Sequence, residues 1–275
     1  DPRVGTAIGE PVPVTQGSRQ TWMPDLSPDG QWLAFTSCEN REDLFIIKTD
    51  GTNLRQLTDD ADRDRLPIFS PDGKRIAFYS TRSKVGSYEL WMIEVNGSGL
   101  RPLTDTSGRI ASTPVWSPDG TRFAYTRTDS HDSFIMDPRL PWRDQIHAPL
   151  RRLGEPAGWF LVRSWSPDGK KLAGERRQDG DSPAGILVYS LEQGRFDQLT
   201  ESGLYPFWLS DSRRLLFVDR AKIYLVDSIS GKTRQVLSVA SHEVSPFRFV
   251  MSRDDRWIYF SRMTIEADIW LATLE

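Results

Sequence analysis

One tetrapeptide, Ser-Pro-Asp-Gly, recurs along the chain at intervals of roughly 45 residues. Self-similarity at a fixed period of this length is typical of stacked or circular repeat architectures. Intact copies stand at 27–30, 70–73, 117–120 and 166–169, and degenerate copies at 210–213 and 252–255. The serines that anchor the six repeats are Ser27, Ser70, Ser117, Ser166, Ser210 and Ser252. The repeats account for nearly all of the 275 residues.

Each repeat predicts four short strands. Aromatic and β-branched residues flank the tetrapeptide, as in 67–69 and 75–78, and such runs favour strands. Proline fixes φ, aspartate accepts turn N–H groups and glycine tolerates a positive φ, so the tetrapeptide predicts a tight hairpin. A third run, such as 89–93, and a fourth, such as 100–104, complete the unit. Four short strands in about 45 residues indicate a propeller blade.

The last repeat ends after its third strand, at 267–274. Segment 12–15 is similar to the fourth strand of other repeats, and Thr15 stands 12 residues before its anchor, as Thr58 does before Ser70. We therefore expect the N-terminal strand to complete the C-terminal blade and close the ring. The expected fold is all-β: a single six-bladed β-propeller domain over residues 1–275, with four-stranded antiparallel blades.

The repeat also resembles a known family. Ser-Pro-Asp-Gly, then an apolar-Ala-aromatic strand as in 76–78, then a closing strand as in 55–58, is similar to the TolB-type propeller repeat, also called the WD40-like or PD40 repeat. The resemblance covers about residues 10–275. The family includes periplasmic propellers that bind proteins, propellers that gate serine peptidases, and propellers appended to bacterial kinases and transcriptional regulators. The resemblance therefore implies the fold and leaves the function open.

Composition excludes several classes of protein. Lys plus Arg is 35 and Asp plus Glu is 38, so the net charge of −3 argues against a dedicated nucleic-acid binder. Apolar runs of about seven residues are too short to cross a bilayer. The lone Cys38 excludes an internal disulfide framework and a cysteine-based zinc site. No Gly-x-Ser-x-Gly nucleophile motif is present.

Residues at one offset from the anchor form a ring at one depth, because blades are related by rotation. At offset ten, Arg127, Arg176, Arg220 and Arg262 predict a basic ring at the channel mouth, with Arg82 two residues beyond Ser80. Arginines beside exposed aromatics are typical of protein-binding hot spots. Loops leading into the first strands add Arg65, Trp22, Trp159, Phe160, Tyr205 and His242. The alternative is that these arginines pair with acids of the same loops and only join neighbouring blades.

No residue is predicted to be catalytic or to bind a metal or another cofactor. The aspartate of each tetrapeptide recurs with the turn, which indicates a structural role. The acidic cluster of Asp59, Asp60, Asp62 and Asp64 lacks EF-hand spacing and is interpreted as a solvated loop. The longest insertion, 137–150, contains three prolines and is expected to be an ordered lid that tucks Trp142 over the blade edge.

The leading hypothesis is a non-catalytic propeller, not an enzyme, that binds a protein or peptide on its loop-rich face at the channel mouth. We expect a monomer that is periplasmic or extracellular rather than cytoplasmic. The alternative is a regulatory or sensory propeller domain of a larger bacterial kinase, transcriptional regulator or serine peptidase. A third hypothesis is a glycosidase or lyase that acts at the channel mouth.

Overall fold

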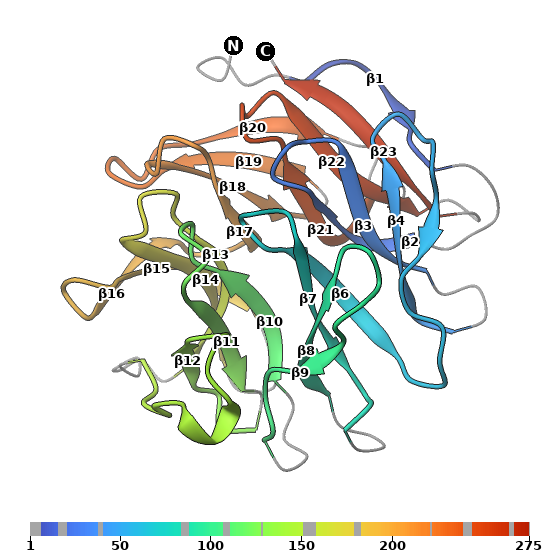
Figure 1. Cartoon of the computed structure of the whole chain (residues 1–275). Helices are drawn as coiled ribbons and strands as arrows, with labels where there is room; N and C mark the ends of the chain where they lie inside the picture. The colour runs from blue at the N-terminus through green and yellow to red at the C-terminus, as the bar shows by residue number, and fades with distance from the viewer. Residues whose placement is uncertain are drawn as a thin grey trace.

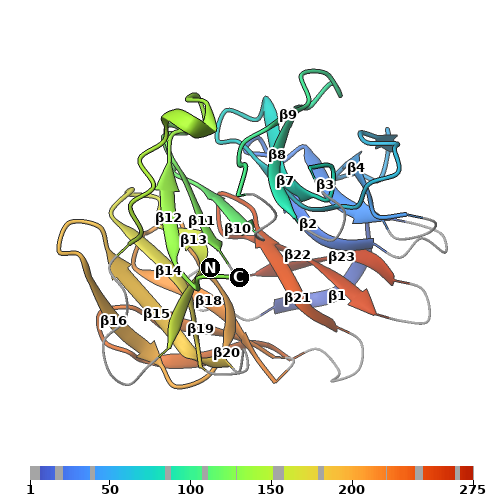
Figure 2. The ribbon, with the colours of Figure 1, turned by 90° about the horizontal axis from the view of Figure 1, so that it is seen from below.

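The fold is all-β and consists of antiparallel sheets arranged as a propeller. The computed structural model describes residues 7–15, 21–37, 41–83, 88–106, 111–127, 129–150, 158–178, 183–220, 222–238, 244–263 and 267–274. These residues form six sheets, which follow one another in chain order around a common centre (Figure 1). Figure 2 shows the same arrangement from below. In the described part of the chain, no helix is long and apolar enough to cross a membrane.

The first three sheets come from the N-terminal half of the chain. Sheet 1 contains β2 (Thr21–Leu26), β3 (Trp32–Ser37), β4 (Asp43–Lys48) and β5 (Arg55–Gln56). Sheet 2 contains β6 (Asp64–Phe69), β7 (Arg75–Ser80), β8 (Glu89–Glu94) and β9 (Arg101–Pro102). Sheet 3 contains β10 (Ala111–Trp116), β11 (Phe123–Arg127) and β12 (Ser133–Met136), and a 3-10 turn, η1 (Trp142–Asp144), follows it.

The other three sheets follow in the same way. Sheet 4 contains β13 (Trp159–Trp165), β14 (Lys171–Arg177), β15 (Pro183–Ser190) and β16 (Arg195–Thr200). Sheet 5 contains β17 (Leu204–Trp208), β18 (Arg214–Asp219), β19 (Lys222–Asp227) and β20 (Thr233–Ser238). Sheet 6 contains β21 (Val244–Met251), β22 (Trp257–Met263), β23 (Ala267–Leu274) and β1 (Ala7–Pro13).

The expected four strands per blade are found in five of the sheets. Sheet 3 departs from the prediction, because its described residues form three strands and a single bridge between Phe134 and Pro149. The lid that follows β12 occupies this edge. Its Trp142 packs on the core cluster around Tyr125, and Arg101 of sheet 2 donates to the carbonyl of Pro138. The predicted tucked lid is therefore confirmed.

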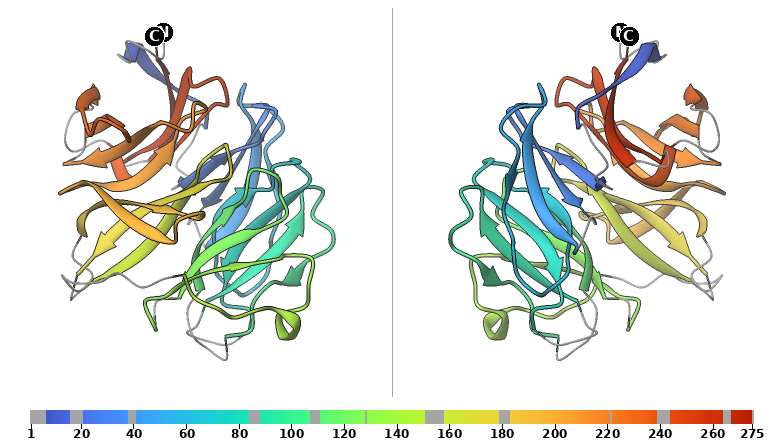
Figure 3. Two further views of the ribbon diagram at one scale, coloured as in Figure 1. Left: turned by 90° about the vertical axis from the view of Figure 1, so that its left-hand side faces the viewer. Right: turned by 90° about the vertical axis from the view of Figure 1, so that its right-hand side faces the viewer.

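The N-terminal strand lies at the outer edge of the last sheet. β1 pairs antiparallel with β23, with Val12 opposite Leu271 and Pro13 opposite Trp270. Both side views of Figure 3 show this blue strand alongside the red β23. It begins at Ala7, five residues before the predicted segment, and Val14 then leaves the sheet to join the apolar core of sheet 1.

Side-chain hydrogen bonds explain why Ser-Pro-Asp-Gly recurs. In sheet 3 the Ser117 hydroxyl donates to Asp119 at 2.6 Å and accepts the N–H of Arg122 at 2.8 Å. Asp119 also accepts the N–H of Thr121 at 3.0 Å. These hydrogen bonds, led by that from Ser117, lower the pKa of Asp119 to about 2. Gly120 closes the turn at φ 69°, where a side chain is disfavoured.

The turn of sheet 5 lies one residue earlier than the sequence predicted. Leu209 N–H donates to the carbonyl of Arg214, as Ser166 N–H does to that of Lys171. Ser212 has φ 55° and occupies the place of the motif glycine. The structural anchor of this sheet is therefore Leu209 and not Ser210, and the residue at offset ten is Asp219. The assignment of Arg220 to that ring position was wrong.

The first strand of every sheet lies nearest the centre. Each of these inner strands contacts the inner strands of both neighbouring sheets, and β21 contacts β2 in the same way. Apolar clusters fill the spaces between the sheets, such as Ala34, Phe69 and Phe78 between sheets 1 and 2. Interdigitation of side chains between facing sheets fixes the position of one blade against the next.

Candidate functional site

The propeller has two faces, which carry different connections between strands. The first three strands of each sheet run antiparallel in chain order, and in four sheets the fourth follows in the same way, so the tetrapeptide hairpins and the hairpins between third and fourth strands lie on one face. We call it the turn face. The loops between second and third strands and the links between sheets lie on the opposite face, which we call the loop face. The residues of the predicted site belong to the loop face.

The side chains of Arg127 and Arg176 have partners within their own sheets and loops. Arg127 Nη2 lies 2.9 Å from Oδ2 of Asp129 in its own loop. Arg176 Nη1 donates to Gln198 at 2.9 Å, and Gln198 belongs to the outermost strand β16. Arg220 stands one residue beyond the ring position. Arg262 lies in β22, opposite Val244, but its side chain lies outside the described residues.

Arg65 and Arg82 join the loops of sheets 1 and 2. Arg65 donates through Nε and Nη2 to the two carboxylate oxygens of Glu42, and its guanidinium lies 5.3 Å from the ring centre of Tyr88. The side chain of Arg82 is 8% exposed and pairs with Asp60 and with Asp64, which is fully buried. These contacts match the alternative interpretation of the arginines, whereas partner binding by them stays a prediction.

The aromatic residues of the predicted site are spread over several sheets. Trp159, at the start of β13, stacks on His131 with ring centres 4.6 Å apart. Tyr205 in β17 has φ 53° and lies under the guanidinium of Arg163, 4.6 Å away. Trp22 is half-buried in β2, and Phe160 is buried in β13. His242 lies outside the described residues.

Two buried carboxylates lie where sheets 1 and 2 meet. Asp43 is 7% exposed, and its Oδ1 has no hydrogen-bond partner among the described residues. Burial, reinforced by the negative charge of Asp64, raises the pKa of Asp43 to about 6. Burial also raises the pKa of Asp64, although Arg82 opposes this shift. Within the described ranges, no group of three or more His, Cys, Asp or Glu side chains could hold a metal ion.

A charged cluster in sheet 4 was missed by the sequence analysis. Glu175 of β14 is fully buried and accepts a hydrogen bond from Arg163 Nε at 2.7 Å, and it also pairs with Arg177. Its Oε1 accepts the backbone N–H of Tyr205, in the next sheet, at 3.0 Å. Burial alone raises the pKa of Glu175, but the charges of Arg163 and Arg177 outweigh burial and leave this pKa below its ordinary value.

This cluster breaks the symmetry of the repeat. Three residues before the structural anchor, four sheets have proline, at Pro24, Pro67, Pro114 and Pro206, whereas sheet 4 has Arg163. Eight residues after the anchor, five sheets have an aromatic residue and sheet 4 has Gly174. A Cβ at Gly174 would lie 2.5 Å from the ring of Phe160, which fills the vacated space. Comparison of these two columns would have singled out Arg163 and Gly174 from the sequence.

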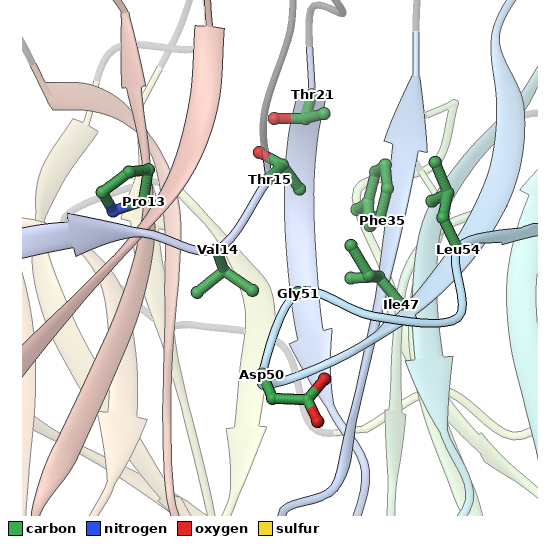
Figure 4. Close-up of a pocket in the computed structure, with 9 residues that line it drawn as sticks. All are labelled: Pro13, Val14, Thr15, Thr21, Phe35, Ile47, Asp50, Gly51 and Leu54. Carbon is green, nitrogen blue, oxygen red and sulfur yellow. The ribbon is translucent and has the colours of Figure 1, made fainter.

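A pocket lies at the seam between sheets 6 and 1. It has a volume of about 240 Å³ and is lined by Val14, Thr15, Thr21, Phe35 and Ile47, with Asp50 and Leu54 at its edge. Figure 4 shows β1 leading into the pocket at Pro13 and Val14, opposite the side chains of Phe35, Ile47 and Leu54. The carbonyl oxygen of Val14 approaches Gly51 so closely that a Cβ there would lie 3.0 Å from it. The pocket therefore depends on how β1 leaves the last sheet.

Several relatives of the chain are peptidases. It is 26% identical to dipeptidyl-peptidase 5 of Porphyromonas gingivalis, in an alignment that covers 100% of the chain and 49% of that protein. It is 28% identical to the uncharacterized peptidase YuxL of Bacillus subtilis over 82% of the chain and 32% of YuxL. It is also 34% identical to Tol-Pal system protein TolB 1 of Novosphingobium aromaticivorans, over 31% of the chain and 18% of that protein. The chain spans less than half the length of each of these relatives.

Solved structures with the same fold include both enzymes and TolB proteins. An oligogalacturonate lyase in complex with manganese has a TM-score of 0.67 at 15% identity, covering 95% of this chain and 79% of the lyase. TolB from Acinetobacter baumannii has a TM-score of 0.64 at 17% identity, covering 94% of this chain and 64% of TolB. The relatives named as peptidases contradict the prediction that this protein is not an enzyme.

The family assignment rests on a match to a known domain family. The sequence pattern of the PD40 TolB β-propeller domain matches residues 7–145, half of the chain. The resemblance inferred from Ser-Pro-Asp-Gly is thus confirmed, and the six sheets extend the same repeat through the second half. The chain belongs to the TolB β-propeller domain family.

Proposed function

We propose that the chain is the propeller part of a peptide-processing enzyme and that its loop face binds peptide at the channel mouth. One observation carries the proposal: the whole chain aligns with 49% of the length of a dipeptidyl-peptidase. The serine-peptidase alternative from the sequence analysis therefore replaces the non-catalytic binder. Binding of a peptide partner on the loop face is common to both hypotheses.

The chemistry of the loop face supports peptide as the ligand. A peptide offers carbonyl and carboxylate acceptors together with apolar side chains, which match arginines placed beside aromatic rings. Sheet 4 and sheet 5 bring Arg163 and Tyr205 together on the inner strands, and Trp159 lies at the start of the same strand as Arg163. Inner strands line the centre of a propeller, where loops converge on a concave mouth.

The proposal treats residues 1–275 as one monomeric domain with six blades in a ring that β1 closes. The pairing of β1 with β23 supports this closure, as does the apolar cluster that joins Val14 and Phe35 to Val250 and Tyr259 of sheet 6. A place in the periplasm or outside the cell is part of the same proposal.

Binding of short unstructured peptides to the chain tests the proposal. We expect saturable binding of at least some members of a panel of eight-residue peptides, measured by calorimetry and by the fluorescence of tryptophan. Oligogalacturonate serves as the comparison ligand. Binding of the sugar acid with no binding of any peptide would contradict the proposal and favour lyase-like chemistry.

The predicted basic ring gives a second test. Charge reversal at Arg127, Arg176, Arg220 and Arg262 together abolishes peptide capture if these side chains bind the ligand. If capture persists, the four arginines serve to bind other residues of the propeller. The contacts of Arg127 with Asp129 and of Arg176 with Gln198 favour this outcome.

A further inference from the structure

We infer that Arg163 binds a carboxylate of the peptide ligand, with the ring of Tyr205 against one face of its guanidinium. This inference rests on the proposed function and specifies its site. Carboxylate groups occur at the C-terminus of a peptide and on Asp and Glu side chains, and both present the same pair of oxygens.

The first argument compares two neighbouring sheets of the same chain. In sheet 3, the hydroxyl of Thr126 accepts the N–H of Val162 in the next inner strand at 3.1 Å. In sheet 4, Glu175 occupies the equivalent position and accepts the N–H of Tyr205 in the next inner strand. A neutral threonine therefore suffices to join two blades at this position. The carboxylate and its two arginines exceed what the fold needs.

The three charged side chains of this cluster are largely buried, so their presence needs an explanation other than stability. Glu175 is fully buried, and the side chains of Arg163 and Arg177 are each 15% exposed. Removing three charged groups from water is costly, and uncharged replacements of buried ion pairs are often neutral or stabilising. A repeat that achieves the same contact with Thr126 gains nothing in stability from the ionic version. We therefore assign the cluster to ligand binding.

The second argument is the geometry of Arg163. The residue lies at the bulge of inner strand β13, where the pairing with β14 shifts register between Val162 and Ser164. Its Nε donates to Glu175, which fixes the plane of the guanidinium. Among the described residues, neither Nη atom has a hydrogen-bonded acceptor. The outer edge of an arginine can bind both oxygens of one carboxylate through parallel hydrogen bonds.

Tyr205 restricts the guanidinium further. The ring centre of Tyr205 lies 4.6 Å from Cζ of Arg163, within the range of a cation–π interaction. With Glu175 at Nε and Tyr205 against one face, the side chain is held in one orientation before any ligand arrives. A preorganised donor loses little conformational entropy on binding. Arg163 thus has the features of a recognition residue, and Glu175 acts as its positioning residue.

The decisive variant gives sheet 4 the residues that sheet 3 has at the same three positions. It carries Arg163→Pro, Glu175→Thr and Arg177→Thr. The equivalent residues of sheet 3 are Pro114, Thr126 and Thr128. Because Pro114 and Thr126 already stand at two of these positions in β10 and β11 of sheet 3, we expect the variant to fold with a melting temperature equal to or above that of the parent. Arg163→Lys serves as a milder variant that keeps the charge but loses the paired hydrogen bonds.

The ligands are one peptide sequence with a free C-terminal carboxylate, the same peptide with a C-terminal amide, and an amide peptide with one internal glutamate. We expect a carboxylate to strengthen binding by about tenfold to a hundredfold in the parent protein. This difference disappears in the triple variant and shrinks in Arg163→Lys. The free-acid and glutamate peptides distinguish the two sources of carboxylate.

The outcomes separate this inference from the proposed function. Equal binding of acid and amide peptides by the parent, or an unchanged difference in the folded triple variant, overturns the role of Arg163 while peptide binding stands. No binding of any peptide overturns both. A triple variant that unfolds at much lower temperature shows that the cluster is structural, and Arg163→Lys with an unchanged carboxylate preference then excludes paired recognition.

Discussion

Thr126 and Glu175 occupy equivalent positions in neighbouring blades, and each accepts a backbone N–H from the next inner strand. The first does so with a neutral hydroxyl and the second with a carboxylate held by two arginines. Within one chain, the repeat therefore provides its own reference for what the fold requires. The departures from that reference in sheet 4 include Arg163, Gly174, Glu175 and Arg177.

Glu175→Gln removes the negative charge from this cluster and leaves Arg163 and Arg177 buried beside a neutral amide. Breaking a buried ion pair costs about 3–5 kcal/mol because the remaining charge loses its partner. The side chains of Arg163 and Arg177 are partly exposed, which reduces this cost. We therefore expect a loss of about 2–3 kcal/mol in the free energy of urea unfolding. Adding Arg163→Pro to Glu175→Gln should recover part of that loss. If the double variant instead loses the sum of what the two single variants lose, the coupling between Arg163 and Glu175 is contradicted.

Gly174→Ala tests how closely Phe160 packs on β14. The added Cβ would lie 2.3 Å from the carbonyl oxygen of Leu161 and 2.5 Å from the Phe160 ring, so backbone and side chain must both shift. We expect a destabilisation of about 2–3 kcal/mol by urea unfolding. Gly97→Ala is the control, since its Cβ meets nothing within 4 Å and the only destabilisation comes from placing alanine at a positive φ of 90°. Equal effects at the two glycines would contradict the tight packing.

Removal of residues 1–16 takes away β1 and exposes the edge of β23. The deletion also removes Val14, which is 7% exposed in the core between sheets 6 and 1. We expect a loss of at least about 3 kcal/mol, which lowers the melting temperature by roughly 10 °C in a chain of this size. Val12→Ser, at a side chain 53% exposed, is the control and should change little. An unchanged melting temperature of the deletion variant would disprove the closing role of β1.

Asp43 should make stability depend on pH. Burial, with the charge of Asp64, raises its pKa in the folded chain to about 6, above the ordinary value of 3.8. Between these pH values the folded state binds more protons than the unfolded state, so this contribution is fully present below about pH 4 and is lost as pH rises through 6. Asp43→Asn should gain about 1–3 kcal/mol relative to the parent at pH 8 and little at pH 4. Urea unfolding at both pH values measures the difference, and equal gains would contradict the raised pKa.

The sequence predicted the repeat and its hairpins because Ser-Pro-Asp-Gly encodes a specific set of hydrogen bonds. Its limits appear where a chemically different turn replaces that motif. In sheet 5, Leu209-Ser210-Asp211-Ser212 keeps the aspartate in place but carries its serine one position later. Because Leu209 and not Ser210 is the structural anchor of sheet 5, the residue ten positions after the anchor is Asp219 and not Arg220.

The candidate site was harder to predict than the fold. The offset-ten column identified arginines by charge alone, whereas the direction of each side chain depends on acids and amides brought near by folding. Arg127 and Arg176 turn towards Asp129 and Gln198 for this reason. Arg163 was not identified because it lies at a strand bulge, in a column where four of the other blades have proline and the last has Phe249. Its partner Glu175 is fully buried, which no local pattern in the sequence indicates.

Hydrogen exchange of the chain with and without a saturating peptide tests the central claim most directly. Peptide binding on the loop face should slow exchange in the segments 158–165 and 203–208, which contain Arg163 and Tyr205. The tetrapeptide hairpins at 27–31, 70–75 and 117–121 lie on the turn face and should exchange at unchanged rates. Protection confined to those hairpins, or no protection anywhere at saturation, would contradict peptide binding by the loop face.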